Sequence, residues 1–309
     1  MTLSAASPKP LLRLLPQTQF HTLLDSGDGE RLERLGSRTF RRAETQAIWP
    51  RSLGDKPWDR ADAVYVQQPG RNHGKWHGEG AQESETVRHG ELSFAVNPMN
   101  SGLTGVFPEQ EPVWRMLDQV LAENGGEGTR VLNLFAFTGI PSLIAARHGA
   151  SITHVDASKP IIENAKENQA LSDLPDDSIR WICDDAVKFV QREARRKNQY
   201  DIVIVDPPKF GRGVKGEVWD FFADIRDFLN DLGAIISDRP LMVALTSYAL
   251  RLSPSALARV FDGTLGELFP DYQLCELGFR EDASGQFLPQ SQCILWAAPP
   301  FDVTRLAVN

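Results

Sequence analysis

Four segments of this 309-residue chain are predicted to be buried strands, and each is followed by glycine or by side chains that can bind a ligand. A loop ending at Gly139 follows the first, and the others end at Asp156, Asp185 and Asp206. Parallel strands of one sheet present their carboxyl ends at a common edge, where such sheets bind ligands. We therefore expect these four strand ends to form one binding site.

The chemistry of the first three ends suits a nucleoside that carries a carboxylate. Gly139 allows the backbone to turn close to a ligand, and the following helix points free N–H groups toward it. Neither a G-x-G-x-x-G pattern nor a P-loop lysine is present, so a pyrophosphate is less favoured. Asp156 can accept hydrogen bonds from ribose hydroxyls, and Asp185 can accept one from an adenine amine. The structural alternatives are a simple turn at Gly139 and helix N-caps at the two acids, although Ser158 is the better N-cap after Asp156.

The fourth end has the sequence Asp206-Pro207-Pro208-Lys209-Phe210. Two prolines directly after a buried strand stiffen the loop and remove two backbone donors. The carbonyl groups of this loop are then available to a planar group.

Helices and strands alternate from Pro112 onward. The apolar pattern predicts helices at 112–126, 141–150, 159–173, 186–198, 216–232 and 254–269, and strands at 129–137, 152–158, 179–186, 200–208, 240–250, 272–281 and 292–299. This order predicts an α/β fold, a Rossmann-like seven-stranded, mostly parallel sheet with helices on both faces. The last two strands lack an intervening helix, which predicts an antiparallel hairpin at the C-terminal edge.

The first third of the chain has a different character. Short alternating segments rich in Gly, Pro and Trp predict a small β-rich lobe at 1–105, with substrate recognition as its expected role, before a larger domain at 106–309. Within the lobe, 30–44 is predicted to contain a short helix and supplies a candidate basic face. Its arginines are Arg31, Arg34, Arg38, Arg41 and Arg42.

The segments GLTGVFPEQ, VLNLFAFTG, HVDAS and YDIVIVDPPKF occur in an order that closely resembles the class I S-adenosylmethionine-dependent methyltransferases. More specifically, they resemble the ribosomal RNA large-subunit methyltransferase I-like family, over about residues 85–300. The resemblance implies S-adenosylmethionine as the cofactor and a reaction centre at Asp206, with Pro207, Pro208 and Phe210. It implies cofactor contacts by Phe107, Gln110, Asn133, Phe135, Ala136, Phe137, Thr138, Gly139, Asp156, Ala157, Ser158, Asp185, Ala186 and Asp206. Glu111 departs from the family, which usually has arginine there.

The reaction is expected to proceed without a covalent intermediate. Carbon-5 methylation of a pyrimidine usually needs a cysteine nucleophile, and the family includes such enzymes. Here neither the fourth nor the fifth strand end holds a cysteine, and Cys183, Cys275 and Cys293 lie elsewhere. We hypothesise that Asp206 and the carbonyl of Pro207 orient the acceptor, with Phe210 or Tyr248 as a stacking platform.

The predicted substrate is a base of RNA, most simply ribosomal RNA. The formal net charge of −8 has the wrong sign for a protein that holds nucleic acid by charge alone. Aromatic residues among cations in the lobe are consistent with RNA, or else form the core of the lobe; they are Trp49, Trp58, Tyr65 and Trp76. The open alternatives are a small-molecule or protein methyltransferase and a catalytically silent cofactor-binding protein. We expect a cytoplasmic location, no membrane segment and no metal, and the oligomeric state is left open.

Overall fold

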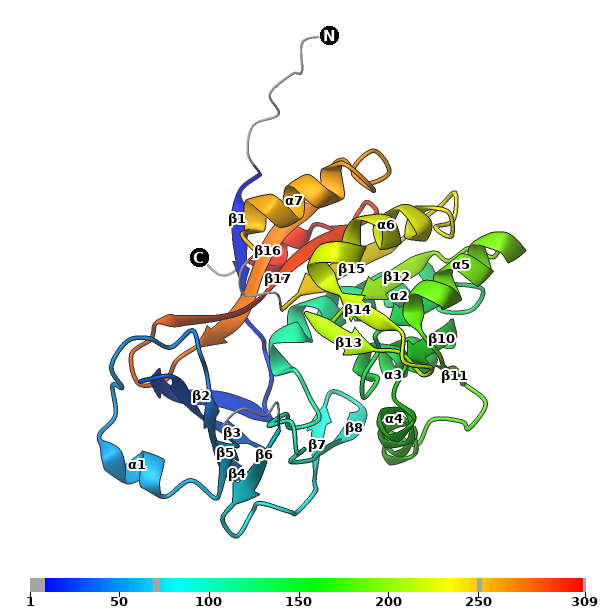
Figure 1. The fold of residues 1–309 in the computed structure, drawn as a ribbon. Helices are drawn as coiled ribbons and strands as arrows, with labels where there is room; N and C mark the ends of the chain where they lie inside the picture. The colour runs from blue at the N-terminus through cyan, green and yellow to red at the C-terminus, as the bar shows by residue number, and fades with distance from the viewer. Residues whose placement is uncertain (1–8, 69–72, 249–251, 308–309) are drawn as a thin grey trace.

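The computed structural model describes residues 9–68, 73–248 and 252–307, and it has two parts (Figure 1). A large sheet covered by helices forms one part, and a small β-rich lobe lies against the far ends of two of its strands. This confirms the predicted fold class. No helix within the described ranges is long and apolar enough to cross a membrane.

The large sheet has eight strands in the order β1-β16-β17-β15-β12-β9-β10-β11. Their bounds are β1 (Leu11–Leu14), β9 (Arg130–Leu134), β10 (Ser151–Asp156), β11 (Ile179–Cys183), β12 (Ile202–Val205), β15 (Met242–Ser247), β16 (Gln273–Arg280) and β17 (Phe287–Ala297). Strand β17 lies between β15 and β16 and is antiparallel to both. The seven predicted strands are all present, apart from the last positions of the 240–250 prediction, which lie outside the described residues.

The eighth strand, β1, was not predicted. It pairs in parallel with β16, with Leu11 opposite Leu274. Strand β1 is therefore the outermost strand at this edge of the sheet, where we had expected the C-terminal hairpin. One segment from the first part of the chain therefore belongs to the larger sheet. The division at residue 105 stays a prediction.

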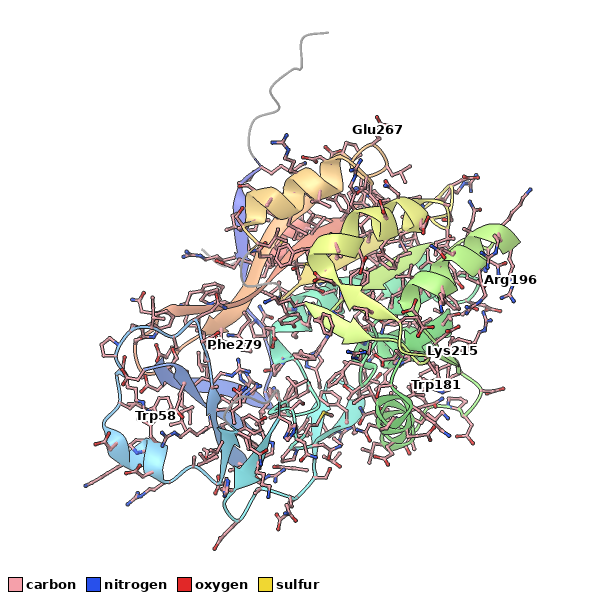
Figure 2. The ribbon with its side chains drawn as sticks, viewed as in Figure 1. Trp58, Trp181, Arg196, Lys215, Glu267 and Phe279 are labelled. Carbon is pink, nitrogen blue, oxygen red and sulfur yellow. The ribbon has the colours of Figure 1, made fainter. Side chains whose placement is uncertain are left out.

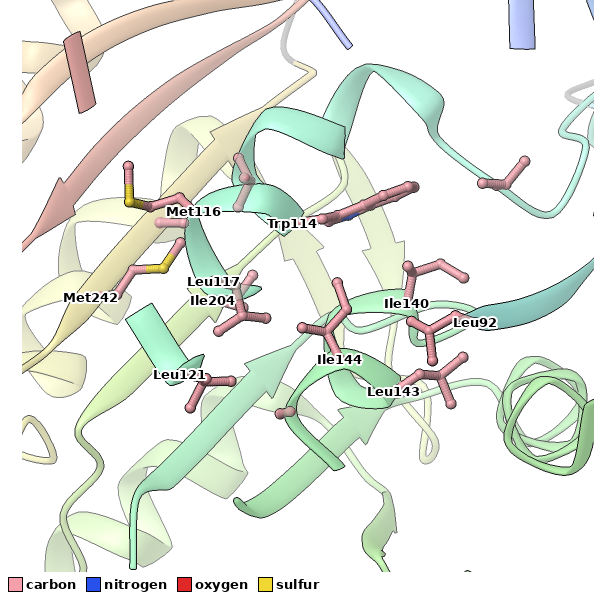
Figure 3. Packing of buried hydrophobic residues seen from close by; sticks show 14 of the residues in the cluster. Leu92, Trp114, Met116, Leu117, Leu121, Ile140, Leu143, Ile144, Ile204 and Met242 are labelled. Carbon is pink, nitrogen blue, oxygen red and sulfur yellow. The ribbon is translucent and has the colours of Figure 1, made fainter. Parts of the chain in front are cut away.

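Helices pack on both faces of the sheet because alternate strand residues point to opposite sides. On one face lie α2 (Glu111–Asn124), α3 (Ile140–Arg147) and α4 (Lys159–Leu171), over strand residues such as Val131 and Ile204 (Figure 3). On the other lie α5 (Ala186–Arg196), α6 (Phe221–Gly233) and α7 (Pro254–Asp262), over Leu132 and Val203. Buried on both faces, the central strands are nearly continuous apolar runs, which is why the sequence revealed them.

The lobe contains a five-stranded sheet and a separate hairpin. The sheet is formed by β2 (His21–Gly27), β3 (Glu30–Leu35), β4 (Arg38–Ala43), β5 (Ala63–Gln67) and β6 (Gly74–His77), with the short helix α1 (Asp55–Asp59). The hairpin is formed by β7 (Glu85–His89) and β8 (Leu92–Val96). Lobe and large sheet meet where Leu23 packs with Phe279 and Leu288 (Figure 2).

The helix predicted within 30–44 is wrong, and the helix predicted at 216–232 is confirmed from Phe221 onward but wrong at its start. Residues 30–44 form the β3–β4 hairpin, in which Leu32 and Leu35 are buried. Residues Val218–Asp220 form the strand β14, paired with β13 (Phe210–Arg212), and α6 begins only at Phe221. In both cases pairing with a neighbouring strand overrides a weak local helical pattern.

Candidate active site

A cavity of about 450 Å³ opens at the carboxyl ends of the central strands, within the size range of small-molecule sites. It lies where the strand order reverses, between β9 and β12, at the point where such sheets bind ligands. A smaller cavity adjoins it and shares Phe107, Phe135, Phe137 and Asp206 with it.

The cavities bring most of the sequence-predicted residues together. The larger is lined by Phe107, Phe135, Phe137, Asp156, Ala157, Ser158, Asp185, Ala186, Asp206 and Pro208, and the smaller adds Gln110, Asn133, Ala136, Thr138 and Gly139. Two predicted residues line neither cavity. Pro207 is buried, and the side chain of Phe210 on β13 is 56% exposed.

The loop after β9 has an unusual backbone. Phe135, Phe137 and Gly139 all have positive φ angles, of 54°, 49° and 84°. Such angles are strained for phenylalanine and are found where surrounding structure holds them, often at functional sites. Gly139 is the N-cap of α3, no side chain caps this helix, and Gly139, Ile140 and Pro141 at its start line the smaller cavity.

Asp156 ties this loop to the end of β10. Its Oδ2 accepts from the Phe137 N–H at 3.0 Å, and its Oδ1 accepts from the Ser158 N–H at 2.8 Å. Burial raises the pKa of Asp156, while these backbone donors oppose the rise. Ser158 is the N-cap residue of α4, although its side chain caps no N–H group. Asp156 is thus a preorganised acceptor on the cavity wall.

The two acids after β11 have different partners. Asp184 forms an ion pair with Arg192, and Asp185 caps α5 by accepting from the Lys188 N–H at 2.9 Å. The N-cap alternative for Asp185 is therefore present in the structure. Asp185 also lines the larger cavity, so capping and ligand contact are compatible.

Asp206 lies at the junction of the two cavities. Its Oδ2 accepts from Gln110 Nε2 at 3.3 Å, and its buried Oδ1 has no hydrogen-bond partner among the described residues. Burial raises the pKa of Asp206 to about 7; the Thr246 hydroxyl opposes this rise, and the nearby charge of Glu109 adds to it. Asp206 is therefore poised to exchange a proton near neutral pH.

Aromatic rings line the rest of the site. Phe107 lies between Phe137, at 5.1 Å, and Tyr248, at 5.4 Å between ring centroids. On the opposite side Phe135 packs against Trp219 of β14 at 5.1 Å, and the Trp219 indole donates to the Pro208 carbonyl at 2.7 Å. Apolar rings combined with a few fixed polar groups are typical of sites for planar ligands.

The β13–β14 hairpin was missed as part of the site. Gly211, Arg212, Gly213 and Trp219 all line the larger cavity, and Leu103 joins them from the loop before Phe107. We had assigned 216–232 to a helix, so Trp219 was not considered. The short alternation around Gly211 and Gly213 was the available signal for a hairpin.

The predicted basic face of the lobe is neutralised. Four of its five arginines form ion pairs with carboxylates, and Arg34 contacts the Thr22 hydroxyl; the pairs are Arg31–Glu33, Arg31–Glu44, Arg38–Glu85, Arg41–Glu30 and Arg42–Glu33. Trp58 is fully buried, as expected for core packing. Glu111, the departure noted above, is buried and accepts from the Gln17 N–H at 2.8 Å.

Comparison with known proteins agrees with this geometry. A family model described as S-adenosylmethionine-dependent methyltransferase matches residues 19–245. The crystal structure of a SAM-dependent methyltransferase from Agrobacterium tumefaciens is 36% identical, has a TM-score of 0.84, and matches 96% of this chain and 97% of that one.

Two curated relatives are similar over shorter stretches. Ribosomal RNA large subunit methyltransferase K/L of Shewanella sp. (strain ANA-3) is 33% identical over 189 residues, 60% of this chain and 25% of that protein. Ribosomal RNA large subunit methyltransferase I of Shewanella frigidimarina is 30% identical over 138 residues, 44% of this chain and 34% of that protein. The matched stretch thus spans a quarter to a third of the length of these relatives.

Proposed function

Because the chain belongs to the S-adenosylmethionine-dependent methyltransferase family, we propose that it transfers the methyl group of S-adenosylmethionine to a base of RNA, with ribosomal RNA as the expected substrate. Support for the substrate comes from the relatives named above, which are named as ribosomal RNA methyltransferases. Ribosomal RNA also implies a cytoplasmic location.

The residues at the strand ends fit this cofactor. Asp156 offers carboxylate oxygens to ribose hydroxyls, and the uncapped N-terminus of α3 offers N–H groups to a carboxylate. Asp185 and Ala186 lie where they would contact the adenine, and Phe107 and Phe137 supply apolar walls. When bound, the cofactor supplies an electrophilic sulfonium methyl.

The observation that carries the proposal is the Asp206 carboxyl. A buried acceptor without a partner is costly, so its Oδ1 favours a ligand that brings a hydrogen-bond donor. A nucleobase N–H is such a donor. Asp206 would align this nitrogen with the methyl group and take the proton that the nitrogen loses as the N–C bond forms. The Pro207–Pro208 turn holds Asp206 in place.

The positions of the cysteines support a mechanism without a covalent intermediate. Cys275 and Cys293 are fully buried in paired strands, and burial raises the pKa of both thiols. Cys183 is exposed at the end of β11, and it is absent from the cavity lining. None of the three thiols lines either cavity, and the charge of Asp206 further raises the pKa of Cys293, which supports a transfer without a thiolate nucleophile.

The β13–β14 hairpin supports RNA as the substrate. Phe210 and Val218 are exposed on it, and Lys209, Arg212 and Lys215 of the same segment form no ion pair with the described residues; Lys215 is labelled in Figure 2. Aromatic rings beside cations bind single-stranded bases and their phosphates. Tyr248 lines the cavity and Phe210 does not, which supports Tyr248 as the ring that stacks on the target base.

A small-molecule or protein substrate is the alternative, favoured by the net charge of −8 and by the paired arginines of the lobe. RNA binding that weakens steeply as salt is raised would distinguish the first proposal from this one.

Mass-spectrometric mapping of the methylated nucleosides lost from ribosomal RNA on gene deletion tests the substrate. Turnover of Asp206→Ala on that RNA at saturating cofactor tests the mechanism. We expect one missing methylated nucleoside and a large loss of turnover. Undiminished turnover would remove Asp206 from the mechanism. A wild type that binds the cofactor but methylates no RNA would favour a catalytically silent cofactor-binding protein.

A further inference from the structure

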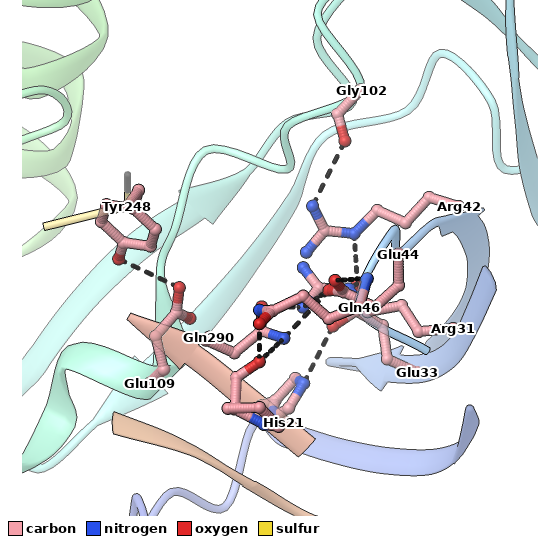
Figure 4. Close-up of polar contacts among 11 residues, drawn as sticks. His21, Arg31, Glu33, Arg42, Glu44, Gln46, Gly102, Glu109, Tyr248 and Gln290 are labelled. Carbon is pink, nitrogen blue, oxygen red and sulfur yellow. Dashed lines mark hydrogen bonds and ion pairs between the residues drawn. The ribbon is translucent and has the colours of Figure 1, made fainter. Parts of the chain in front are cut away.

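Glu109 is a buried carboxyl that is linked to Asp206 through Tyr248 and Gln110, and Figure 4 shows its contact with Tyr248. It lies in a short 3-10 turn, Pro108–Gln110, and is 2% exposed. Its Oε1 accepts from the Tyr248 hydroxyl at 3.0 Å. Gln110 Nε2 contacts the Tyr248 oxygen at 3.1 Å and Asp206 Oδ2 at 3.3 Å. The chain of contacts therefore runs Glu109–Tyr248–Gln110–Asp206.

The directions of these hydrogen bonds are fixed by the number of protons available. Tyr248 has a single hydroxyl proton, and it is donated to Glu109. The phenol oxygen is then free to accept from the Gln110 amide, whose second N–H points to Asp206. A carboxylate at Glu109 thus holds the Tyr248 proton on its own side, and the Gln110 amide is left as the donor to both the Tyr248 oxygen and Asp206.

We propose that Glu109 is a positioning residue for Asp206, acting through Tyr248 and Gln110, and that its charge controls the proton on Asp206. This inference rests on the proposed function, because it concerns the group assigned to take the proton. Glu109 itself lines neither cavity, so it would act without touching the substrate.

The electrostatic surroundings support this assignment. Burial raises the pKa of Glu109 to about 7; Arg31 of β3 opposes the rise, and Glu33 of β3 adds to it. Tyr248 donates to Glu109, and the charge of Glu109 raises the pKa of Asp206. Burial therefore raises the pKa of both carboxyls, and the charge of Glu109 disfavours ionisation of Asp206.

Arg31 links this pair to the lobe. Its guanidinium donates to Gln290 of β17 and pairs with Glu33 and Glu44. The lobe therefore supplies Arg31, the cation that limits the rise in the Glu109 pKa. The same Arg31 side chain also connects the lobe to β17.

The test is the pH dependence of methyl transfer to ribosomal RNA from a gene-deletion strain, under single-turnover conditions. We expect the wild-type rate to rise through a midpoint near the Asp206 pKa. In Glu109→Gln the midpoint should fall by roughly half to one pH unit, because a like charge no longer opposes Asp206 ionisation. Glu109→Asp should return the midpoint toward the wild-type value.

Glu193→Gln is a matched control. Glu193 is also fully buried and accepts from a tyrosine hydroxyl, Tyr200, at 2.8 Å, but it lies on α5 away from the cavities. Its substitution should leave the midpoint unmoved. A wild-type midpoint in Glu109→Gln, with normal binding of S-adenosylhomocysteine, would overturn the proposal.

Infrared titration of the buried carboxylic acid bands separates this inference from the proposed function, since it needs no methyl acceptor. The band lost in Asp206→Asn identifies Asp206, and in Glu109→Gln that band should titrate at lower pH than in the wild type. An unmoved Asp206 band would overturn the proposal even if the RNA is methylated. A moved band with no methylation of the RNA would support the inference and reject only the assigned substrate.

Discussion

The backbone N–H of Phe137 donates to Asp156 Oδ2 at 3.0 Å, which joins the loop after β9 to the end of β10. Phe137 has a positive φ angle of 49°, so this bond helps to hold a backbone conformation that phenylalanine seldom adopts. A single carboxylate therefore serves both as a proposed ribose ligand and as a support for the neighbouring loop.

Asp156→Asn should weaken cofactor binding about 10- to 100-fold, because hydrogen bonds to a charged group contribute about 1.5–3 kcal/mol. The side-chain amide of the variant has one oxygen, so its NH2 group would face the backbone N–H of either Phe137 or Ser158, and that hydrogen bond would be lost. Equilibrium dialysis with tritiated S-adenosylmethionine measures the change. Asp177→Asn, on an exposed turn, makes the same charge change and should leave Kd within about twofold. Equal affinities of the two variants would contradict the assignment of Asp156.

Gly139→Ala should destabilise the fold by about 1–3 kcal/mol. The φ angle at Gly139 is +84°, and an added Cβ would lie 3.2 Å from the His154 ring. Gly263→Ala is the control, because Gly263 has a φ of −80° and its added Cβ would meet only ordinary contacts. Urea denaturation of both variants checks this. Equal stabilities would show that the loop does not depend on this backbone conformation.

The raised pKa of Asp206 predicts a pH-dependent stability. The folded protein keeps this proton up to about pH 7, whereas the unfolded chain releases it near 3.8. The wild type therefore loses the contribution of Asp206 to stability as pH rises through this interval, and Asp206→Asn lacks this contribution at every pH. Between pH 5 and pH 8, the stability of the variant relative to the wild type should improve by about 2–3 kcal/mol. Denaturant titrations at both pH values test this, and a difference that is independent of pH would show that Asp206 ionises normally.

The hairpin cations should contribute to RNA affinity without sequence preference. Combined substitution of Lys209, Arg212 and Lys215 by alanine should lower the slope of log affinity against log salt by up to about 2. Arg195, Arg239 and Arg259 are exposed elsewhere, and their combined substitution removes the same charge. Filter binding to ribosomal RNA across a salt series compares the two. Matching slopes would mean that the hairpin lies outside the RNA contact.

The sequence predicted the parts of the fold in which local pattern and tertiary environment agree. Central strands such as β9 and β12 are buried on both faces, so their continuous apolar runs identified them. Asp156 and Asp206 were found because each directly follows such a run. Predicting that the polar residues at the strand ends lie together requires only the rule that parallel strands present their carboxyl ends at one edge of the sheet.

The errors concern contacts between distant parts of the chain. Leu11 pairs opposite Leu274, and no local pattern near either residue indicates that pairing. Arg42 appeared free in the sequence, but Glu33 on the adjacent strand neutralises it. Glu109 and Tyr248 are 139 positions apart, and only the folded structure shows that the Tyr248 hydroxyl donates a hydrogen bond to Glu109.

Calorimetric titration of S-adenosylhomocysteine into the folded protein tests the central claim most directly. We predict saturable heat with one site per chain, and a clear loss of affinity in Asp156→Asn. A well-folded protein that produces no heat with this ligand or with S-adenosylmethionine would contradict the assignment of the cavity as the cofactor site.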